Sequence, residues 1–327
     1  MTSKKLLVVI LALLVVCASA DAQRKAGISG ASFLKVGVGA RSVGMGSAVT
    51  TIGEDVEQMF CNPAGITLRD ERMQASFSYA NWLAGITHVA GSASYNIEKI
   101  GTIGVGLITF GDSKIPALRD PFTDPSTSST YSYMDMAAQV SFARYMTDHL
   151  ALGITVKYIN ETIDDRSASA VAVDVGSLYD VGILGWKVGA RLSNVGSDLT
   201  YYDYASPIPI TFSMGTSIVP LKTDEQSIMV AADVVKQQDY LPYFNVGLEY
   251  GIEKMIDLRA GYKFNYSDTQ DLGRTNRNPI QTSIEGWSLG AGLHTRWADY
   301  SIAFDYSFTD MKILNDVHRF TLRLGWM

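Results

Sequence analysis

Residues 150–162 read Leu-Ala-Leu-Gly-Ile-Thr-Val-Lys-Tyr-Ile-Asn-Glu-Thr, and their alternation decides the fold class. One set of alternate positions holds Leu150, Leu152, Ile154, Val156 and Tyr158, and the other holds Ala151, Gly153, Thr155, Lys157 and Glu161. Successive side chains of a β-strand point to opposite faces, so this stretch is a strand with one apolar and one polar face. The pattern recurs in residues 186–194 and 255–266, which predicts a sheet of two-faced strands.

The same test, applied from Arg72 onward, predicts about fourteen strands. They begin near Met73, Ile86, Ile100, Tyr131, Leu150, Ser169, Trp186, Pro209, Ser227, Tyr243, Met255, Trp287, Tyr300 and His318. All nine prolines fall outside these strands or at their margins. That placement supports the assignment, because proline removes a hydrogen-bond donor from a sheet.

The connections between the predicted strands mostly alternate in length. Residues 251–254 and 298–299 are short connections, whereas residues 111–130 and 267–286 are long ones. This pattern is typical of outer-membrane barrels, which have short periplasmic turns and long outer loops. The alternation is imperfect, because the links near 81–85 and 164–168 are also short. We predict an all-β fold: a transmembrane antiparallel β-barrel of about fourteen strands.

A soluble β-sandwich would alternate in the same way, with its apolar face in a core, so the polar faces have to decide. They carry seven acidic and seven basic residues, a balance that fits a confined lumen where charges must be paired or hydrated. The predicted lumen network is Asp135, Lys157, Glu161, Asp174, Lys187, Arg191, Asp233, Glu249, Asp257, Arg259, Lys263, Asp305, Arg319 and Arg323. Aromatic residues near many strand ends, such as Trp297 and Tyr300, resemble the interfacial girdles of membrane barrels.

The N-terminus has the order of residues found in secretory signal peptides. Lys4 and Lys5 precede the apolar run Leu6–Val16, which is followed by the small-residue site Ala18-Ser19-Ala20. We predict that residues 1–20 are removed and that the protein is exported to the bacterial outer membrane. Lipidation at Cys17 is disfavoured, because the residue before a lipidated cysteine should be small and Val16 is not.

The composition excludes several classes of function. The net charge of −6 argues against a nucleic-acid-binding face. No phosphate-binding loop or nucleophile-elbow motif occurs, and the four histidines are scattered without metal-ligand spacing. We therefore predict no enzyme activity, no metal and no cofactor, and we interpret the lumen charges as structural rather than catalytic.

Residues 21–70 differ from the rest, because they are rich in glycine and lack sustained alternation. We predict that this segment is a plug folded into the lumen of a barrel formed by residues 71–327. Its motif residues are Gly44, Met45, Gly46, Asn62, Pro63, Ala64 and Gly65. Glycine permits tight backbone turns, and Asn-Pro favours a turn. Shaping of the plug is the simpler interpretation, and gating of the barrel is the alternative.

The stretch Gly39-Ala40-Arg41-Ser42-Val43-Gly44-Met45-Gly46, followed by Cys61-Asn62-Pro63-Ala64-Gly65-Ile66, resembles the opening of PorV/PorQ-family proteins. That family is similar to the FadL-like barrels, which have fourteen strands and an N-terminal plug. Later segments, such as residues 245–250 and 258–262, resemble PorV/PorQ more than FadL itself. The resemblance implies a role in a type IX secretion system, with secreted cargo proteins and translocon or attachment-complex subunits as partners beside outer-membrane lipid.

Two classes of function follow. The first is binding and shuttling of secreted proteins, for which Phe122 and Ile280 in the long loops are candidate partner anchors. The alternative is a FadL-like channel for small hydrophobic molecules. It requires an apolar path beside the plug, and the charged and small residues expected in the lumen weakly disfavour it. Fold analogy alone does not decide between them.

Overall fold

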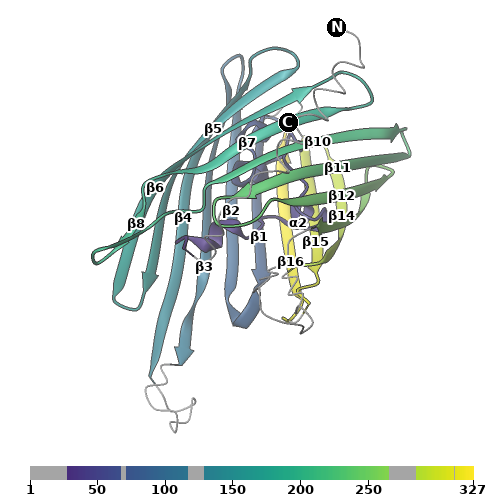
Figure 1. The fold of residues 1–327 in the computed structure, drawn as a ribbon. Coiled ribbons are helices and arrows are strands. Elements are labelled where there is room, and N and C mark those ends of the chain that lie inside the picture. The colour runs from purple at the N-terminus through teal and green to yellow at the C-terminus, as the bar shows by residue number, and fades with distance from the viewer. Residues whose placement is uncertain (1–27, 68–70, 117–128, 265–284, 313) are drawn as a thin grey trace, which may run out of the picture.

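The computed structural model describes residues 28–67, 71–116, 129–264, 285–312 and 314–327, and it is a closed antiparallel β-barrel (Figure 1). Fourteen strands form the barrel, which agrees with the predicted number. The barrel strands are β1 Met73–Asn81, β2 Thr87–Ile97, β3 Gly101–Pro116, β4 Thr130–Tyr145, β5 Leu150–Ile163, β6 Arg166–Asp180, β7 Lys187–Gly196, β10 Thr211–Lys222, β11 Gln226–Gln237, β12 Tyr243–Ile252, β13 Ile256–Phe264, β14 Trp287–Trp297, β15 Tyr300–Thr309 and β16 Val317–Trp326.

Each strand pairs with the next along the chain, except that β7 pairs with β10. The barrel closes where β1 pairs with β16, from Met73 opposite Trp326 to Asn81 opposite His318. Because the strand number is even, the start of β1 and the end of β16 lie at the same end of the barrel. We call this end the turn end, after its connections 98–100, 146–149, 181–186, 223–225, 253–255 and 298–299, and the opposite one the loop end.

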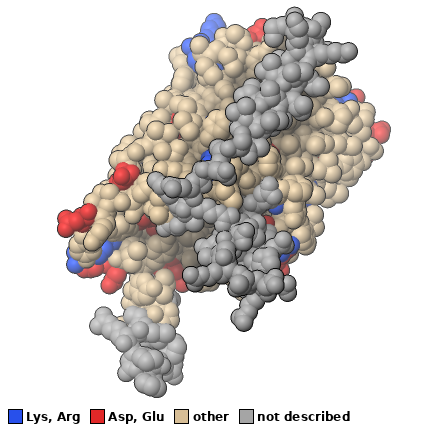
Figure 2. All heavy atoms as spheres, in the orientation of Figure 1, with Lys and Arg blue, Asp and Glu red and all other residues tan. Residues whose placement is uncertain are grey.

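The apolar face of the strands points out of the barrel. On β5, Leu152, Ile154 and Val156 are exposed, whereas Thr155 and Lys157 are buried. A soluble sandwich would show the reverse, so the outward face is suited to lipid. Figure 2 shows one side of the molecule, on which charged side chains gather mainly toward the margins and leave most of the wall uncharged.

Two local features differ from the prediction. The segment between β7 and β10 contains a small hairpin, β8 Leu199–Tyr201 and β9 Tyr204–Ser206, which was not predicted. Pro220 lies within β10 rather than beside it, and the register with β11 shifts between Ile218 and Leu221. A bulge at this position accommodates the missing donor of the proline.

The N-terminal segment lies against the inner faces of the strands (Figure 1, purple). Its helical turns are η1 Ser32–Lys35, α2 Ala40–Gly44, η2 Val56–Phe60 and η3 Pro63–Ile66, and a further turn, η4 Leu83–Gly85, follows β1. Asp55 and Asn62 cap η2 and η3 by accepting hydrogen bonds from the amides of Glu57 and Ala64. α2 packs against β13 to β16, and η3 packs against β4 to β6. Among the described residues, no helix is long and apolar enough to cross a membrane.

Candidate functional site

Glycines of the barrel wall leave room for the N-terminal segment, because a side chain at these positions would overlap it. A Cβ atom on Gly247 of β12 would lie 2.5 Å from the carbonyl oxygen of Met45. A Cβ atom on Gly46, which has a φ of +62°, would lie 2.7 Å from the amide nitrogen of Tyr262. Such distances are too short for a carbon atom, so the two backbones can approach this closely only because one partner of each contact is a glycine. The Gly46 amide also donates to the Ser288 hydroxyl at 3.1 Å.

On the other side of the lumen, close contacts with wall glycines also position the Asn62-Pro63-Ala64-Gly65 motif. Asn62 Nδ2 donates to the carbonyl of Thr50 at 2.6 Å and to the carbonyl of Ser177 on β6 at 3.0 Å. Cβ atoms on Gly153 and Gly176 of the wall would overlap Pro63 and Asn62, respectively. The motif therefore joins the N-terminal segment to β5 and β6.

Ion pairs tie the same segment to the β12 to β16 side. Arg41 of α2 contacts Glu249 at 2.8 Å and Asp55 at 3.4 Å, and Asp55 also pairs with Arg323 of β16. Arg259, which is fully buried, contacts Glu249 at 2.6 Å, Asp257 at 2.9 Å and Asp305 at 2.5 Å. Glu249 therefore belongs to both groups and connects α2 to the wall.

Two acidic residues of the N-terminal segment, both outside the barrel strands, have shifted pKa values. Burial raises the pKa of Glu57 to about 7, and the neighbouring Asp55 carboxylate adds to the rise. Burial also opposes ionisation of Asp55, but Arg323 and Arg41 outweigh it and lower the pKa of that carboxyl group. Ser76 on β1 donates to Glu57 Oε1 at 2.8 Å, while Glu57 Oε2 is buried and has no hydrogen-bond partner among the described residues. The segment is thus held partly by a carboxyl group that titrates near neutral pH.

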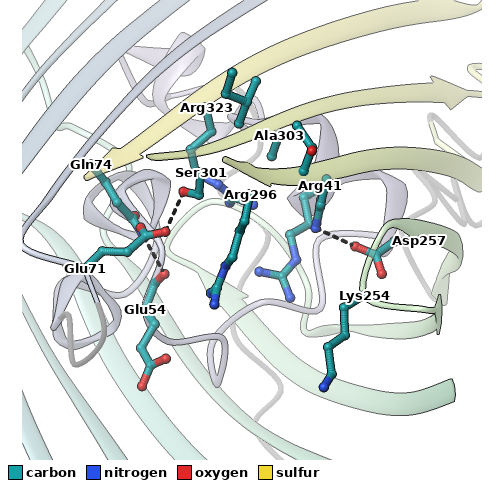
Figure 3. Close-up of a pocket in the computed structure, with 13 residues that line it drawn as sticks. Arg41, Glu54, Glu71, Gln74, Lys254, Asp257, Arg296, Ser301, Ala303 and Arg323 are labelled. Carbon is teal, nitrogen blue, oxygen red and sulfur yellow. Dashed lines mark hydrogen bonds and ion pairs between the residues drawn. The ribbon is translucent and has the colours of Figure 1, made fainter. Parts of the chain in front are cut away.

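A polar cavity of about 420 Å³ lies beside these ion pairs at the turn end. Figure 3 shows Arg41, Arg296 and Lys254 extending into one space, with Glu54 and Glu71 on its other side. Glu71 accepts hydrogen bonds from Ser301 and Gln74, both at 2.5 Å. The cavity carries charges of both signs, so water or a polar ligand fits it better than a hydrocarbon.

The loop end of the lumen is apolar on one side, contrary to the expectation of mostly charged or small residues. Strand register places five inward residues in one row across β2 to β6, and all five are buried: Ala90, Ile108, Ala137, Ile159 and Ala170. We call this row the apolar band. Phe33 of η1 packs in the same cluster, and its ring lies 6.4 Å from that of Phe110. Part of the wall therefore offers the N-terminal segment a hydrocarbon surface.

All fourteen predicted lumen residues are buried or half-buried, but only some pair with one another. Lys157 contacts Asp174 at 2.7 Å, and Arg259 pairs as described, whereas Lys263 pairs with Glu285, which was not in the predicted set. The prediction that these fourteen charges pair among themselves is therefore only partly correct. Three of the acidic residues accept hydrogen bonds from neutral groups instead. Asp135 accepts from the Tyr133 hydroxyl, and Glu161 accepts from the Ala31 amide. Asp233 accepts from the amides of Val49 and Thr50. Arg319 is buried, and its Nε and Nη2 atoms have no hydrogen-bond partner in the described part of the chain. Lys187 lies half-buried beside Gly53.

Sequence reasoning missed the residues that link segment and wall. Arg41 and Asp55 make their contacts with Glu249 and Arg323 across more than 200 residues of sequence, so no local pattern reveals them. The predicted signal peptide and the loop anchors Phe122 and Ile280 lie outside the described residues. In the part of the chain that is described, no three His, Cys, Asp or Glu side chains are grouped to hold a metal.

Comparison with solved structures finds the same fold. The toluene transporter TbuX of Ralstonia pickettii is 14% identical, with a TM-score of 0.58 over 89% of this chain and 98% of that one. The toluene transporter TodX of Pseudomonas putida is 12% identical, with a TM-score of 0.59 over 89% and 97%. A FadL homologue of Pseudomonas aeruginosa is 12% identical, with a TM-score of 0.54 over 88% and 98%. No family model and no curated protein match the chain. At these identities the likeness concerns the fold, a FadL-like barrel.

Proposed function

We propose that this chain is an outer-membrane channel that admits small hydrophobic molecules past an N-terminal plug. The turn end faces the periplasm, as the short connections there suggest. Toluene transport is the activity named for TbuX and TodX, which share the fold. The shared fold favours the hydrophobic-molecule alternative over the secretion role.

The observation that supports this proposal best is the apolar band. The lumen of a membrane barrel is normally polar, because an apolar side chain has a lower free energy in contact with lipid than in contact with water. Ile108 and Ile159 nevertheless point inward, between Ala90, Ala137 and Ala170. Alternating large and small residues leave an uneven apolar surface beside Phe33, along which a hydrocarbon is solvated when the plug shifts.

The lining of the proposed path is apolar toward one end of the barrel and polar toward the other. The apolar band and Phe33 lie toward the loop end, where a hydrophobic molecule would enter. The polar cavity with Arg41 and Arg296 lies toward the turn end. A closed plug is consistent with a gated channel, because Phe33 and Val38 are buried against the wall.

Uptake of radiolabelled toluene into cells whose outer membrane has an intact lipopolysaccharide layer tests the proposal, because a plain phospholipid bilayer would not hold toluene back. The variant Ile159→Thr places a hydroxyl in the apolar band, and Ile154→Thr makes the same change on the outward face of the same strand. We expect uptake to fall several-fold in the first variant and to match the unmodified protein in the second. Uptake no faster than in matched cells that lack the protein would refute the channel.

The shuttling of secreted proteins remains the second proposal, and it is supported by the PorV/PorQ resemblance. The Gly-Met-Gly and Asn-Pro-Ala-Gly motifs that carry the resemblance contact the wall, so they explain the seating of the segment rather than a partner. Purification from the native envelope distinguishes the two: secreted proteins or translocon subunits in the eluate support shuttling, and bound hydrophobe supports the channel.

A further inference from the structure

A second cavity lies between the N-terminal segment and the wall, away from the polar cavity at the turn end. Its volume is about 70 Å³, several times what a single water molecule requires. Residues 34–38 and Cys61 line it from the segment, and side chains of β5, β7 and β10 to β13 line it from the wall. A group bound here would touch both parts of the protein.

The lining is one-sided in charge. Four cations face the cavity, namely Lys35, Lys157, Arg191 and Lys263, and no Asp or Glu is among the described residues that line it. The lysines have carboxylate partners behind them: Asp239 for Lys35 at 2.5 Å, Asp174 for Lys157 at 2.7 Å and Glu285 for Lys263 at 2.6 Å.

Arg191 differs from the three lysines. It donates to the Ser213 hydroxyl at 3.1 Å, and within the described residues it makes no ion pair. Asp233 is within electrostatic reach, and its Oδ2 atom accepts from the amides of Val49 and Thr50 at 2.8 and 2.9 Å, but among the described residues neither of its oxygens bonds to Arg191. A partly buried guanidinium without a carboxylate is costly unless another anion offsets its charge.

Unused hydroxyl groups point to the same conclusion. Ser193 is 4% exposed and lines the cavity, and its Oγ atom has no hydrogen-bond partner among the described residues. Ser47, which lines the cavity from the N-terminal segment, has a buried Oγ atom in the same condition. Buried hydroxyls are normally satisfied, so two of them beside an arginine indicate a missing acceptor.

We propose that this cavity binds one small oxyanion, a carboxylate or a phosphate group, with Arg191 and Ser193 as its ligands in the wall. Guanidinium and hydroxyl donors around a small space are the chemistry that recognises such groups. The bound anion bridges the N-terminal segment to the wall and so stabilises the closed plug. The proposal does not depend on what passes through the barrel.

Cys61 provides a built-in reporter, because it lines the same cavity and is the only cysteine outside residues 1–20. The full mature barrel in detergent is titrated with acetate or with inorganic phosphate at constant ionic strength, and binding is followed by calorimetry. In parallel, the rate of Cys61 modification by a small neutral thiosulfonate is measured. We expect saturable binding of at least one anion and slower modification in its presence. The anion that binds more tightly identifies the source of the group.

Three variants make the test specific, and a fourth is held in reserve. Arg191→Gln should weaken binding at least tenfold and remove the protection of Cys61, whereas Arg191→Lys, which keeps the charge, should retain part of both. Arg166→Gln removes the same charge from an exposed position and should change neither. If Arg191→Gln fails to fold, Ser193→Ala serves instead, with an expected loss of about threefold. Absence of saturable binding in the unmodified protein, or equal binding in Arg191→Gln, would overturn the proposal.

Discussion

Replacement of Gly247 by alanine should loosen the N-terminal segment without harming the barrel. The added Cβ would lie 2.5 Å from the Met45 carbonyl oxygen, and ordinary contact begins near 3.4 Å, so the segment must retreat by 3.4 − 2.5 = 0.9 Å. That carbonyl accepts the Ala48 amide at 3.1 Å, and the adjacent Gly46 amide donates to Ser288, so the shift strains both bonds. Overpacking of this kind costs about 1–3 kcal/mol.

Hydrogen exchange measured by mass spectrometry reports this cost as local opening of residues 40–50. A loss of about 1–3 kcal/mol corresponds to exchange faster by roughly 5- to 150-fold, since about 1.4 kcal/mol is a factor of ten. Gly91→Ala is the matched control, because a Cβ there meets nothing within 4 Å. Exchange in Gly247→Ala equal to that in the control and the unmodified protein would refute the idea that wall glycines seat the segment.

The remaining predictions concern charge and lipid contact. Arg259→Met leaves Glu249, Asp257 and Asp305 without their shared cation and should cost about 3–5 kcal/mol in urea unfolding, whereas a cost below about 1 kcal/mol would contradict the network. Glu57 has a folded-state pKa of about 7, above its usual value, so its contribution to stability is fully present below about pH 4.5 and is lost as the pH rises through 7. The urea concentration at the midpoint of unfolding should therefore decrease as the pH is raised from about 5 to about 8. An equal decrease in Glu57→Gln would show that another group is responsible. Val156→Arg puts a charge on the lipid face and should cost about 2–4 kcal/mol, whereas Asp165→Arg, at an exposed loop tip, should cost almost nothing by the same assay.

The strands could be predicted from the sequence because a lipid-facing wall imposes strict alternation. On β5 the period-two pattern from Leu150 to Tyr158 leaves one assignment, and the predicted start coincides with the observed one. The β8–β9 hairpin was not predicted, because strands of three residues are too short to show the alternation of apolar and polar side chains. Pro220 was excluded from β10 by a rule that a bulge relaxes.

The candidate site was less predictable, for two physical reasons. The inward face of β5 was judged by Thr155 and Lys157, whereas Ile159, on the same face, joins a hydrocarbon row that only strand register reveals. The partners of Arg41 and Asp55 lie on strands far along the chain, and closure of the barrel alone brings them together. Sequence periodicity identifies faces, and it does not identify which residues of distant faces meet.

The strands turn their apolar face to lipid, while their inward face surrounds the N-terminal segment. Fluorophores attached one at a time at positions 151, 152 and 154–158, in a protein with Cys61 replaced by alanine, measure this directly in vesicles that contain brominated lipid. We expect quenching at 152, 154, 156 and 158 and little at 151, 155 and 157. Uniform quenching, or quenching of the second set rather than the first, would contradict the account.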